Sequence, residues 1–215
     1  MSFDLLAPHY GWMERVLAGR LLQRARTAWI DRLADRERLL IAGVGHGRSL
    51  HELLPRHRRL RVTCVDASAG MLREAENRAR RARLDLSRIQ FIHACLPEWR
   101  AEAGAFDAIA THFFLDCFAP RELSAVVAGL ADAAAPDAVW LVTDFAVPER
   151  GWTRHRARAV HALMYAFFRV ATRLPARRLT PPDDLLAAQG FALGGRRTFS
   201  RGLLQADWWR RPRAA

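Results

Sequence analysis

Three glycines and one carboxylate form the first group of residues whose types and spacing suggest chemistry. Gly43, Gly45 and Gly47 follow an apolar run, residues 38–42, and precede a predicted helix. Glycines let the backbone turn sharply and approach a ligand closely, and a helix start offers unpaired N–H groups. Asp66 ends the next apolar run, where a carboxylate can accept both ribose hydroxyls of an adenosine. Together these residues predict a site for an adenosine-containing cofactor.

The spacing of the glycines distinguishes between adenosine cofactors. A dinucleotide site has the pattern GxGxxG, whose third glycine packs the helix against the strand. This chain has GxGxG instead, and Arg48 occupies the position of that third glycine. Together with the antiparallel strands that we expect near the C-terminus, this spacing favours S-adenosylmethionine over NAD.

A histidine and an aspartate follow the fourth predicted strand. His112 and Asp116 are four residues apart, so they would share a face if their segment began a helix. A histidine partnered by a carboxylate can accept a proton near neutral pH, which methylation of a phenol or quinol would require. In the structural alternative, His112 bonds to the backbone and Asp116 caps or turns the chain. Asp144, at the end of the fifth predicted strand, is a weaker candidate.

Short apolar runs alternate with helical patterns through most of the chain. We expect strands at 38–43, 60–65, 89–94, 106–110 and 138–143, and helices at 10–35, 48–54, 69–83 and 121–134. This alternation predicts βαβ units, a parallel sheet and right-handed crossovers. After a helix that opens at 181–183, strands at 191–199 and 203–209 are joined by a link too short for a crossover helix, so they must pair antiparallel.

With these elements in place, the chain resembles the class I methyltransferases over nearly its whole length. The glycine segment resembles the first motif of that family, Asp66 the second, residues 91–96 the adenine-pocket segment, and residues 106–112 the fourth motif. Residues 3–10 look like the lid of the ubiquinone/menaquinone-biosynthesis type, whose tyrosine closes over the cofactor. The resemblance implies an α/β, Rossmann-like methyltransferase fold: a mostly parallel seven-stranded sheet with a C-terminal antiparallel hairpin and helices on both faces.

The resemblance and the spacing together give a set of predicted site residues. His112 and Asp116 are the predicted catalytic residues. The predicted contacts with S-adenosylmethionine, or with its product S-adenosylhomocysteine, are Tyr10, Gly43, Gly45, Gly47, Asp66, Ala67, Met71, Cys95, Leu96, Thr111 and His112. No metal ligands are predicted.

Two positions depart from the family pattern. The acid that usually stands two residues before the first glycine is Ile41, and the acid expected at the adenine amino group is Cys95. Each lost hydrogen bond would weaken cofactor binding by about 0.5–1.5 kcal/mol. These departures keep a non-catalytic, cofactor-binding homologue open as an alternative.

The domain plan is a single unit over 1–215, with a lid and helix (1–35), a cofactor-binding core (36–148), a helical cap insertion (149–180) and a C-terminal helix and hairpin (181–215). In the insertion, an apolar stripe opposes a set of arginines. The stripe is Val160, Leu163, Met164, Phe167, Phe168, Ala171 and Leu174. It either packs on the domain or caps an acceptor pocket, and the arginines are suited to anionic lipid headgroups.

Composition limits the choice of partner and of compartment. The formal net charge is +12, but all 34 basic residues are arginine, a pattern typical of GC-rich codon usage. The charge alone therefore does not indicate nucleic acid, and residues 111–114 lack the proline-rich tetrad of the exocyclic-amino methylases. With three cysteines in unrelated contexts and no signal or spanning segment, we expect a cytoplasmic protein, with peripheral contact to anionic membranes as an option.

These observations lead to one main hypothesis. We expect S-adenosylmethionine-dependent methylation, at oxygen or carbon, of a small acceptor that is apolar or aromatic, such as a quinol. A lipid-amine N-methyltransferase and the non-catalytic homologue are the alternatives.

Overall fold

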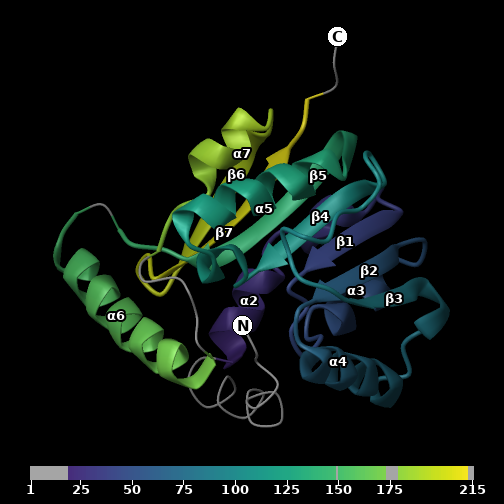
Figure 1. The fold of residues 1–215 in the computed structure, drawn as a ribbon, viewed down its shortest axis with the longest axis horizontal. Coiled ribbons are helices and arrows are strands. Elements are labelled where there is room, and N and C mark those ends of the chain that lie inside the picture. Colours follow the sequence, from purple (N-terminus) through teal and green to yellow (C-terminus); the bar gives the residue numbers. More distant parts are fainter. Residues whose placement is uncertain (1–18, 149, 173–178, 213–215) are drawn as a thin grey trace.

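The computed structural model describes residues 19–148, 150–172 and 179–212, and for residues 19 and 163–172 it describes the backbone alone. Seven strands form one sheet in the order β3-β2-β1-β4-β5-β7-β6 (Figure 1). The strands are β1 (Arg38–Ala42), β2 (Arg61–Asp66), β3 (Ile89–His93), β4 (Phe106–His112), β5 (Ala134–Phe145), β6 (Ala192–Phe199) and β7 (Leu204–Arg210). The first five are parallel, and β7 runs antiparallel to both β5 and β6.

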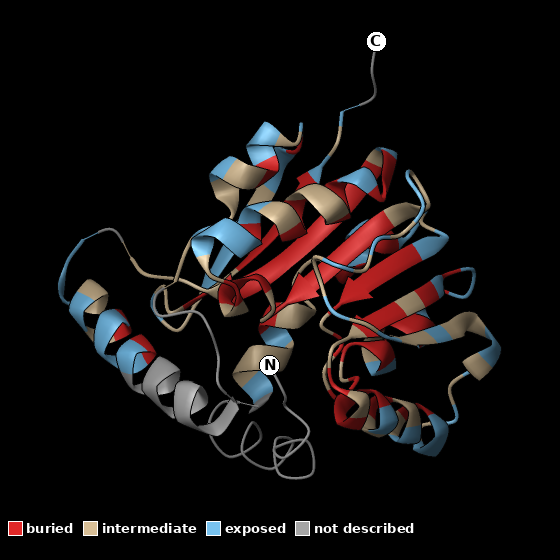
Figure 2. Cartoon of the chain, viewed as in Figure 1, coloured by how far each residue is buried: buried red, intermediate tan, exposed pale blue. Residues whose placement is uncertain are grey.

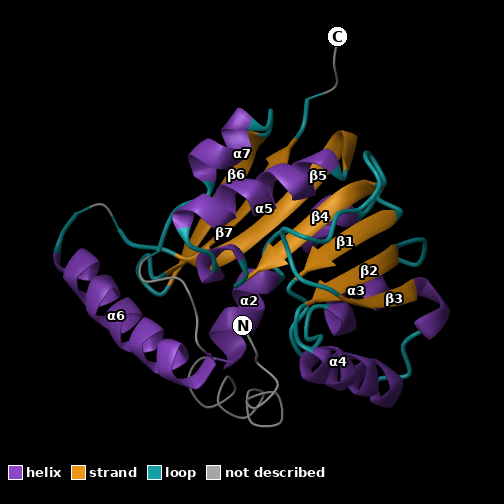
Figure 3. Cartoon of the chain, in the orientation of Figure 1, coloured by secondary structure: helices purple, strands orange, loops and turns teal. Residues whose placement is uncertain are grey.

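Helices cover both faces of this sheet (Figure 3). They are α2 (Gly19–Arg26), α3 (Leu50–Arg56), α4 (Ala69–Arg81), α5 (Pro120–Asp132), α6 (Trp152–Thr172) and α7 (Asp183–Ala188), with short 3-10 turns η1 (Ile30–Leu33), η2 (Leu86–Arg88) and η3 (Leu115–Cys117). One core packs α5 and α7 on the sheet, and a second core packs η1, α3 and α4 on the opposite face. The predicted fold class is confirmed.

The central strands are apolar because helices cover them on both sides. Residues 39–42 of β1 are all buried, as are residues 108–112 of β4 (Figure 2). Continuous apolar runs of this kind are typical of parallel strands that have no solvent-facing side. The parallel arrangement brings the carboxyl ends of β1, β2, β4 and β5 to one edge of the sheet, and the site described below lies at that edge.

The predicted helix over 10–35 is wrong in its second half. Residues 10–18 lie outside the described residues, and α2 ends at Arg26. At Trp29 the chain turns, because the indole Nε1 donates to the carbonyl of Ala206 on β7 at 2.9 Å and the ring packs at 6.4 Å from that of Trp208. A contact with a strand far along the chain therefore ends the helix.

Other boundaries also differ from expectation, and β5 begins at Ala134, four residues before the predicted start. Helix α3 continues to Arg56 with Pro55 in its last turn, two residues beyond the predicted end at residue 54. Strand β4 extends to His112, two residues beyond the predicted end, because it pairs with β5 as far as Thr143. Within the described ranges, no helix is both long and apolar enough to cross a membrane.

Candidate active site

The glycine turn connects β1 to α3 at the carboxyl edge of the sheet. All three glycines have positive φ, of 72° at Gly43, 53° at Gly45 and 77° at Gly47. A Cβ on Gly43 would lie 2.2 Å from the ring of Phe114, and one on Gly47 would lie 2.9 Å from the backbone of Ala75 in α4. A Cβ on Gly45 would meet nothing within 4 Å. Two of the glycines therefore allow close packing, and the third leaves open space where a ligand can approach the backbone.

Asp66 is held beside this turn by two backbone N–H groups. The amide of Gly45 donates to Oδ2 and the amide of Ser68 donates to Oδ1, both at 2.9 Å. The carboxylate thus ties the tip of β2 to the middle of the glycine turn. A carboxylate has about four acceptor positions, so it can accept more hydrogen bonds than these two. Its role as the ribose anchor stays a prediction with suitable geometry.

The start of α4 continues the same edge. Ser68 caps the helix by accepting from the amide of Met71 at 3.1 Å, and Met71 is buried. The carbonyl of Ala67 accepts from Nε2 of His93, the last residue of β3, at 3.1 Å. Residues Cys95 and Leu96 follow on the next loop, where Cys95 is exposed and Leu96 is half-buried. These residues lie around the tips of β2 and β3, where we predicted the adenosine contacts.

Two other predicted cofactor contacts, Thr111 and Tyr10, add little to the description of this site. The Thr111 hydroxyl is fully buried and accepts from Nε1 of Trp140 at 3.0 Å, so its side chain belongs to the core on the α5 face. A contact between Thr111 and the cofactor stays a prediction. Tyr10, with the rest of the predicted lid, lies outside the described residues.

His112 is the last residue of β4 and is nine-tenths buried. Its strand partner is Thr143, whose hydroxyl donates to the carbonyl of Ala25 in α2 at 3.5 Å. The side of the sheet on which His112 and Thr143 lie is therefore the side next to α2. Burial, and then the nearby charge of Arg26, lower the pKa of His112 to about 3. Among the described residues, nothing bonds to its Nδ1. The imidazole is therefore neutral at physiological pH, and it is hard to protonate.

Asp116 pairs with Asp144 instead of His112. The amide of Asp116 donates to Oδ2 of Asp144 at 3.2 Å, and both side chains are buried. Burial, and then the charge of Asp116, raise the pKa of Asp144 well above its usual range. Two buried carboxylates this close repel each other, which favours the protonated form of Asp144.

The predicted arrangement of His112 and Asp116 on one helical face is therefore wrong. The strand continues to His112, Phe113 then takes a positive φ of 54°, and Asp116 lies in the 3-10 turn η3. Because side chains alternate along a strand, Asp144 points away from the face that Thr143 shares with His112. The imidazole and the carboxyl pair belong to opposite faces of the sheet edge.

Aromatic rings line the α2 side of this edge. The rings of Phe113 and Phe145 lie 5.3 Å apart, Phe145 lies 5.4 Å from the ring of His161 in α6, and the Arg26 guanidinium lies 4.9 Å from the Phe113 ring centroid. Local sequence spacing does not identify Arg26 and His161 as site residues, because their partners Phe113 and Phe145 are more than ten residues away. Val160 belongs to the predicted apolar stripe but is 37% exposed; among the described side chains of α6, Ala157 and His161 are buried.

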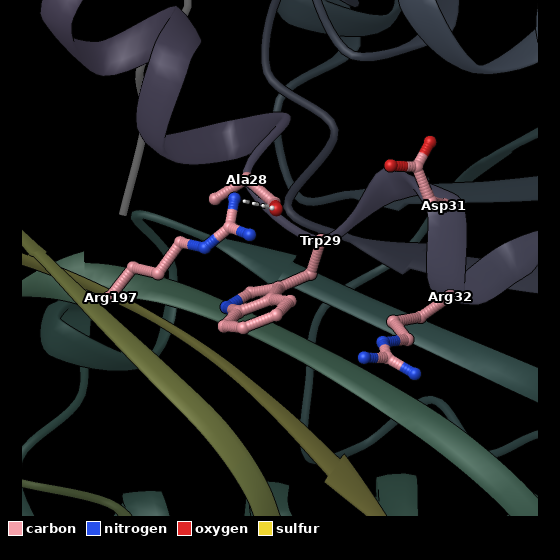
Figure 4. A pocket seen from close by; sticks show the side chains of 5 residues that line it. All are labelled: Ala28, Trp29, Asp31, Arg32 and Arg197. Carbon is pink, nitrogen blue, oxygen red and sulfur yellow. Dashed lines mark hydrogen bonds between the residues drawn. The ribbon is translucent and has the colours of Figure 1, made fainter.

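A pocket lies away from the glycine turn. It is lined by Ala28, Trp29, Asp31, Arg32 and Arg197 (Figure 4). Arg197 donates to the carbonyl of Ala28 at 2.8 Å and lies 4.2 Å from the ring centroid of Trp29. These contacts fix the edge strand β6 to the turn after α2. The residues that line this pocket therefore have a structural role. Across the described part of the chain, no group of three or more metal-ligating side chains comes together.

Comparison with known proteins agrees with this geometry. Residues 39–137 match the family model of a methyltransferase domain, and no curated protein sequence matches the chain. A similar solved structure is 1,6-didemethyltoxoflavin-N1-methyltransferase from Burkholderia thailandensis with bound S-adenosylhomocysteine, with a TM-score of 0.69, 18% identity, and coverage of 97% of this chain and 86% of that one.

Other neighbours share the fold at similar levels. Mitomycin 7-O-methyltransferase has a TM-score of 0.69 and 16% identity, over 98% of this chain and 61% of its own. A [4+2]-cyclase has a TM-score of 0.65 and 15% identity, over 87% of this chain and 81% of its own. This chain thus spans less than two thirds of the mitomycin enzyme.

The family match and the fold confirm the predicted class. The match covers residues 39–137, and the rest of the chain completes a fold shared with solved methyltransferases, one of which has bound S-adenosylhomocysteine.

Proposed function

We propose that this protein transfers a methyl group from S-adenosylmethionine to an oxygen or carbon atom of a small aromatic or apolar acceptor, such as a quinol. The observation that carries the proposal is the glycine turn, bound through Gly45 to Asp66 at the edge where the parallel strands end. In open α/β sheets, ligands bind outside the carboxyl ends of the strands. The open space over Gly45 and the carboxylate beside it fit the sugar of a nucleoside.

The residues at this edge can position an acceptor without an elaborate catalytic apparatus. S-adenosylmethionine, when bound, supplies a methyl group on a sulfonium that is already activated, so catalysis consists largely of positioning and exclusion of water. Phe113, Phe145 and His161 form a rim at this edge, and the half-buried rings of the two phenylalanines provide an apolar wall for an acceptor. Where the acceptor loses a proton, the Asp116–Asp144 pair and His112 are the titratable groups nearest the end of β4.

Several observations support a small acceptor. Two of the neighbours named above, the toxoflavin and mitomycin methyltransferases, act by their names on small molecules at nitrogen and at oxygen. The resemblance of residues 3–10 to the lid of the ubiquinone/menaquinone-biosynthesis type favours a quinol-like ring. The Phe113–Phe145 ring pair is a suitable contact for such a ring.

A non-catalytic homologue is the second candidate. It is favoured by Ile41, which is 1% exposed within the apolar core where the family has an acid, and by Cys95 in the predicted adenine pocket. The cyclase neighbour has the same fold and a different activity in its name. A lipid-amine N-methyltransferase is the third candidate, and it differs from the main proposal in the acceptor atom.

The test uses the purified full chain, S-adenosylmethionine with a labelled methyl group, and two acceptor sources: a lipid extract and a panel of phenols, quinols and amines. We expect label in an extractable quinol or phenol, and calorimetry should detect S-adenosylhomocysteine binding. Binding of the cofactor with no transfer to any acceptor would favour the non-catalytic candidate. Label found only in amines would favour the lipid-amine alternative, and absence of cofactor binding would contradict all three.

Peripheral contact with anionic membranes is a companion proposal. Helix α6 exposes Trp152 (60%) and Val160 (37%), and Arg158 of the same helix is also exposed. Apolar and cationic side chains on one exposed helix are suited to the headgroup region of an anionic bilayer. Such contact would bring the protein close to a membrane-derived acceptor.

A further inference from the structure

Helix α6 buries a histidine and exposes a valine. His161 is 4% exposed, whereas its neighbour Val160 is 37% exposed. Within the described part of the chain, neither ring nitrogen of His161 has a hydrogen-bond partner. A buried polar group normally has a partner, because removing it from water without one is unfavourable. The two ring nitrogens of His161 are therefore available to a polar group that binds from beyond the described residues.

The position of His161 suggests which partner this is. Its ring packs edge-on against Phe145 at the carboxyl end of β5, with a centroid separation of 5.4 Å and an interplanar angle of 76°. Phe145 in turn contacts Phe113, the residue after His112. Figure 1 shows α6 beyond the edge of the sheet toward which the parallel strands point. His161 therefore belongs to the rim where the acceptor of the proposed reaction would bind.

The chemistry of this rim favours oxygen over a cationic nitrogen. Burial lowers the pKa of His161, and burial with Arg26 lowers that of His112, so both imidazoles are neutral near pH 7. A neutral imidazole has one N–H donor and one acceptor nitrogen, which match a hydroxyl or a carbonyl oxygen. The guanidinium of Arg26 lies over Phe113 and repels an ammonium group while it attracts electron-rich oxygen.

We propose that His161 binds an oxygen substituent of an aromatic acceptor whose ring packs against Phe145. This inference rests on the proposed function and narrows it: the acceptor is an oxygenated aromatic, such as a phenol or quinol, and α6 provides the residue that selects for that oxygen. His161 is then a specificity-determining residue, and it makes no contact with the cofactor.

The experiment uses the full chain saturated with S-adenosylhomocysteine. Hydroquinone is the probe, and p-xylene is a ligand of the same shape without oxygen. We expect hydroquinone, and not p-xylene, to shift the imidazole ¹⁵N resonances that are lost in His161→Phe. In that variant the Kd for hydroquinone should rise by at least about tenfold, since a hydrogen bond is lost, while S-adenosylhomocysteine affinity stays unchanged.

Two controls separate this role from a structural one. His155→Phe makes the same change at an exposed position of α6 and should leave hydroquinone affinity unchanged. His161→Phe should raise the melting temperature, because it removes two unpaired buried nitrogens and retains a ring against Phe145. A lowered melting temperature with unchanged hydroquinone affinity would establish a structural role and overturn the inference.

The remaining outcomes are also decisive. Suppose that S-adenosylhomocysteine binds to wild type. If hydroquinone then binds wild type and His161→Phe with equal affinity, or does not shift the resonances of the His161 ring, the inference is wrong and the proposed function stands. If S-adenosylhomocysteine itself does not bind to wild type, the proposed function fails first.

Discussion

Asp66 combines two tasks that can be separated by experiment. Its carboxylate fixes the glycine turn through the amides of Gly45 and Ser68, and it is the predicted anchor for the ribose. We expect Asp66→Ala to weaken S-adenosylhomocysteine binding by about 1.5–3 kcal/mol, because a charged bidentate contact is lost. Calorimetry on wild type and variant measures this difference. Asp66→Asn, which retains one acceptor oxygen for the turn, should show an intermediate loss; unchanged affinity in both variants would contradict the assignment.

The Asp116–Asp144 pair predicts an unusual dependence of stability on pH. The pKa of Asp144 is raised in the folded protein, whereas an unfolded aspartate titrates near about 3.9. The folded state therefore binds more protons in the window between these values, and stability falls as pH rises through it. Asp144→Asn removes this loss, so its free energy of unfolding should exceed that of wild type at pH 7 and approach it near pH 4.

Urea denaturation across this pH range tests the prediction. Asp184→Asn, at an exposed position of α7, is the matched control and should follow the wild-type profile. The prediction is wrong if the free energy of unfolding of wild type rises between pH 4 and 7 relative to that of Asp144→Asn. The pair would then be fully ionised and stabilising.

At the scale of elements, the glycine turn is held by the packing of α4 against it. A Cβ on Gly47 would lie 2.9 Å from backbone and side-chain atoms of Ala75, and the φ of 77° is unfavourable for any residue with a Cβ. The left-handed backbone conformation alone should cost an alanine about 1–2 kcal/mol. We expect Gly47→Ala to lower the free energy of unfolding by more than this, because α4 must also move.

Gly104→Ala is the control for that prediction. Gly104 has a similar φ of 68°, but a Cβ there would meet nothing within 4 Å. Urea denaturation of both variants isolates the packing contribution as their difference. Equal losses would mean that α4 adapts freely and does not fix the turn.

The elements were predictable to different degrees. The parallel strands were located within about two residues at most ends, because buried strands are short apolar runs bounded by glycine or charged residues. The break after α2 was not predictable, because it depends on the bond between Trp29 and Ala206, which are 177 residues apart. The prediction that His112 and Asp116 share a helical face was wrong for a related reason. The hydrogen bonds between β4 and β5 extend β4 to His112, so no helix begins there.

For the whole molecule, the net charge of +12 gives a prediction about membranes. We expect the protein to co-sediment with vesicles that contain anionic lipid at low salt and to be released as salt rises, because exposed charges are screened within about 10 Å at 0.1 M. Neutral vesicles provide the comparison. Trp152→Ala should reduce the binding that remains at high salt; a protein that stays in the supernatant at low salt would contradict the proposal.

The sequence by itself determined the order of strands and helices, the glycine turn with its neighbouring carboxylate, and hence the cofactor class. These features depend on local spacing and on the rule that parallel strands end at one edge. Only the tertiary structure decided which side chains meet at that edge: Asp116 with Asp144, and His161 with Phe145. Such pairs join residues from separate elements, and their geometry follows from how those elements pack, which short-range patterns do not encode.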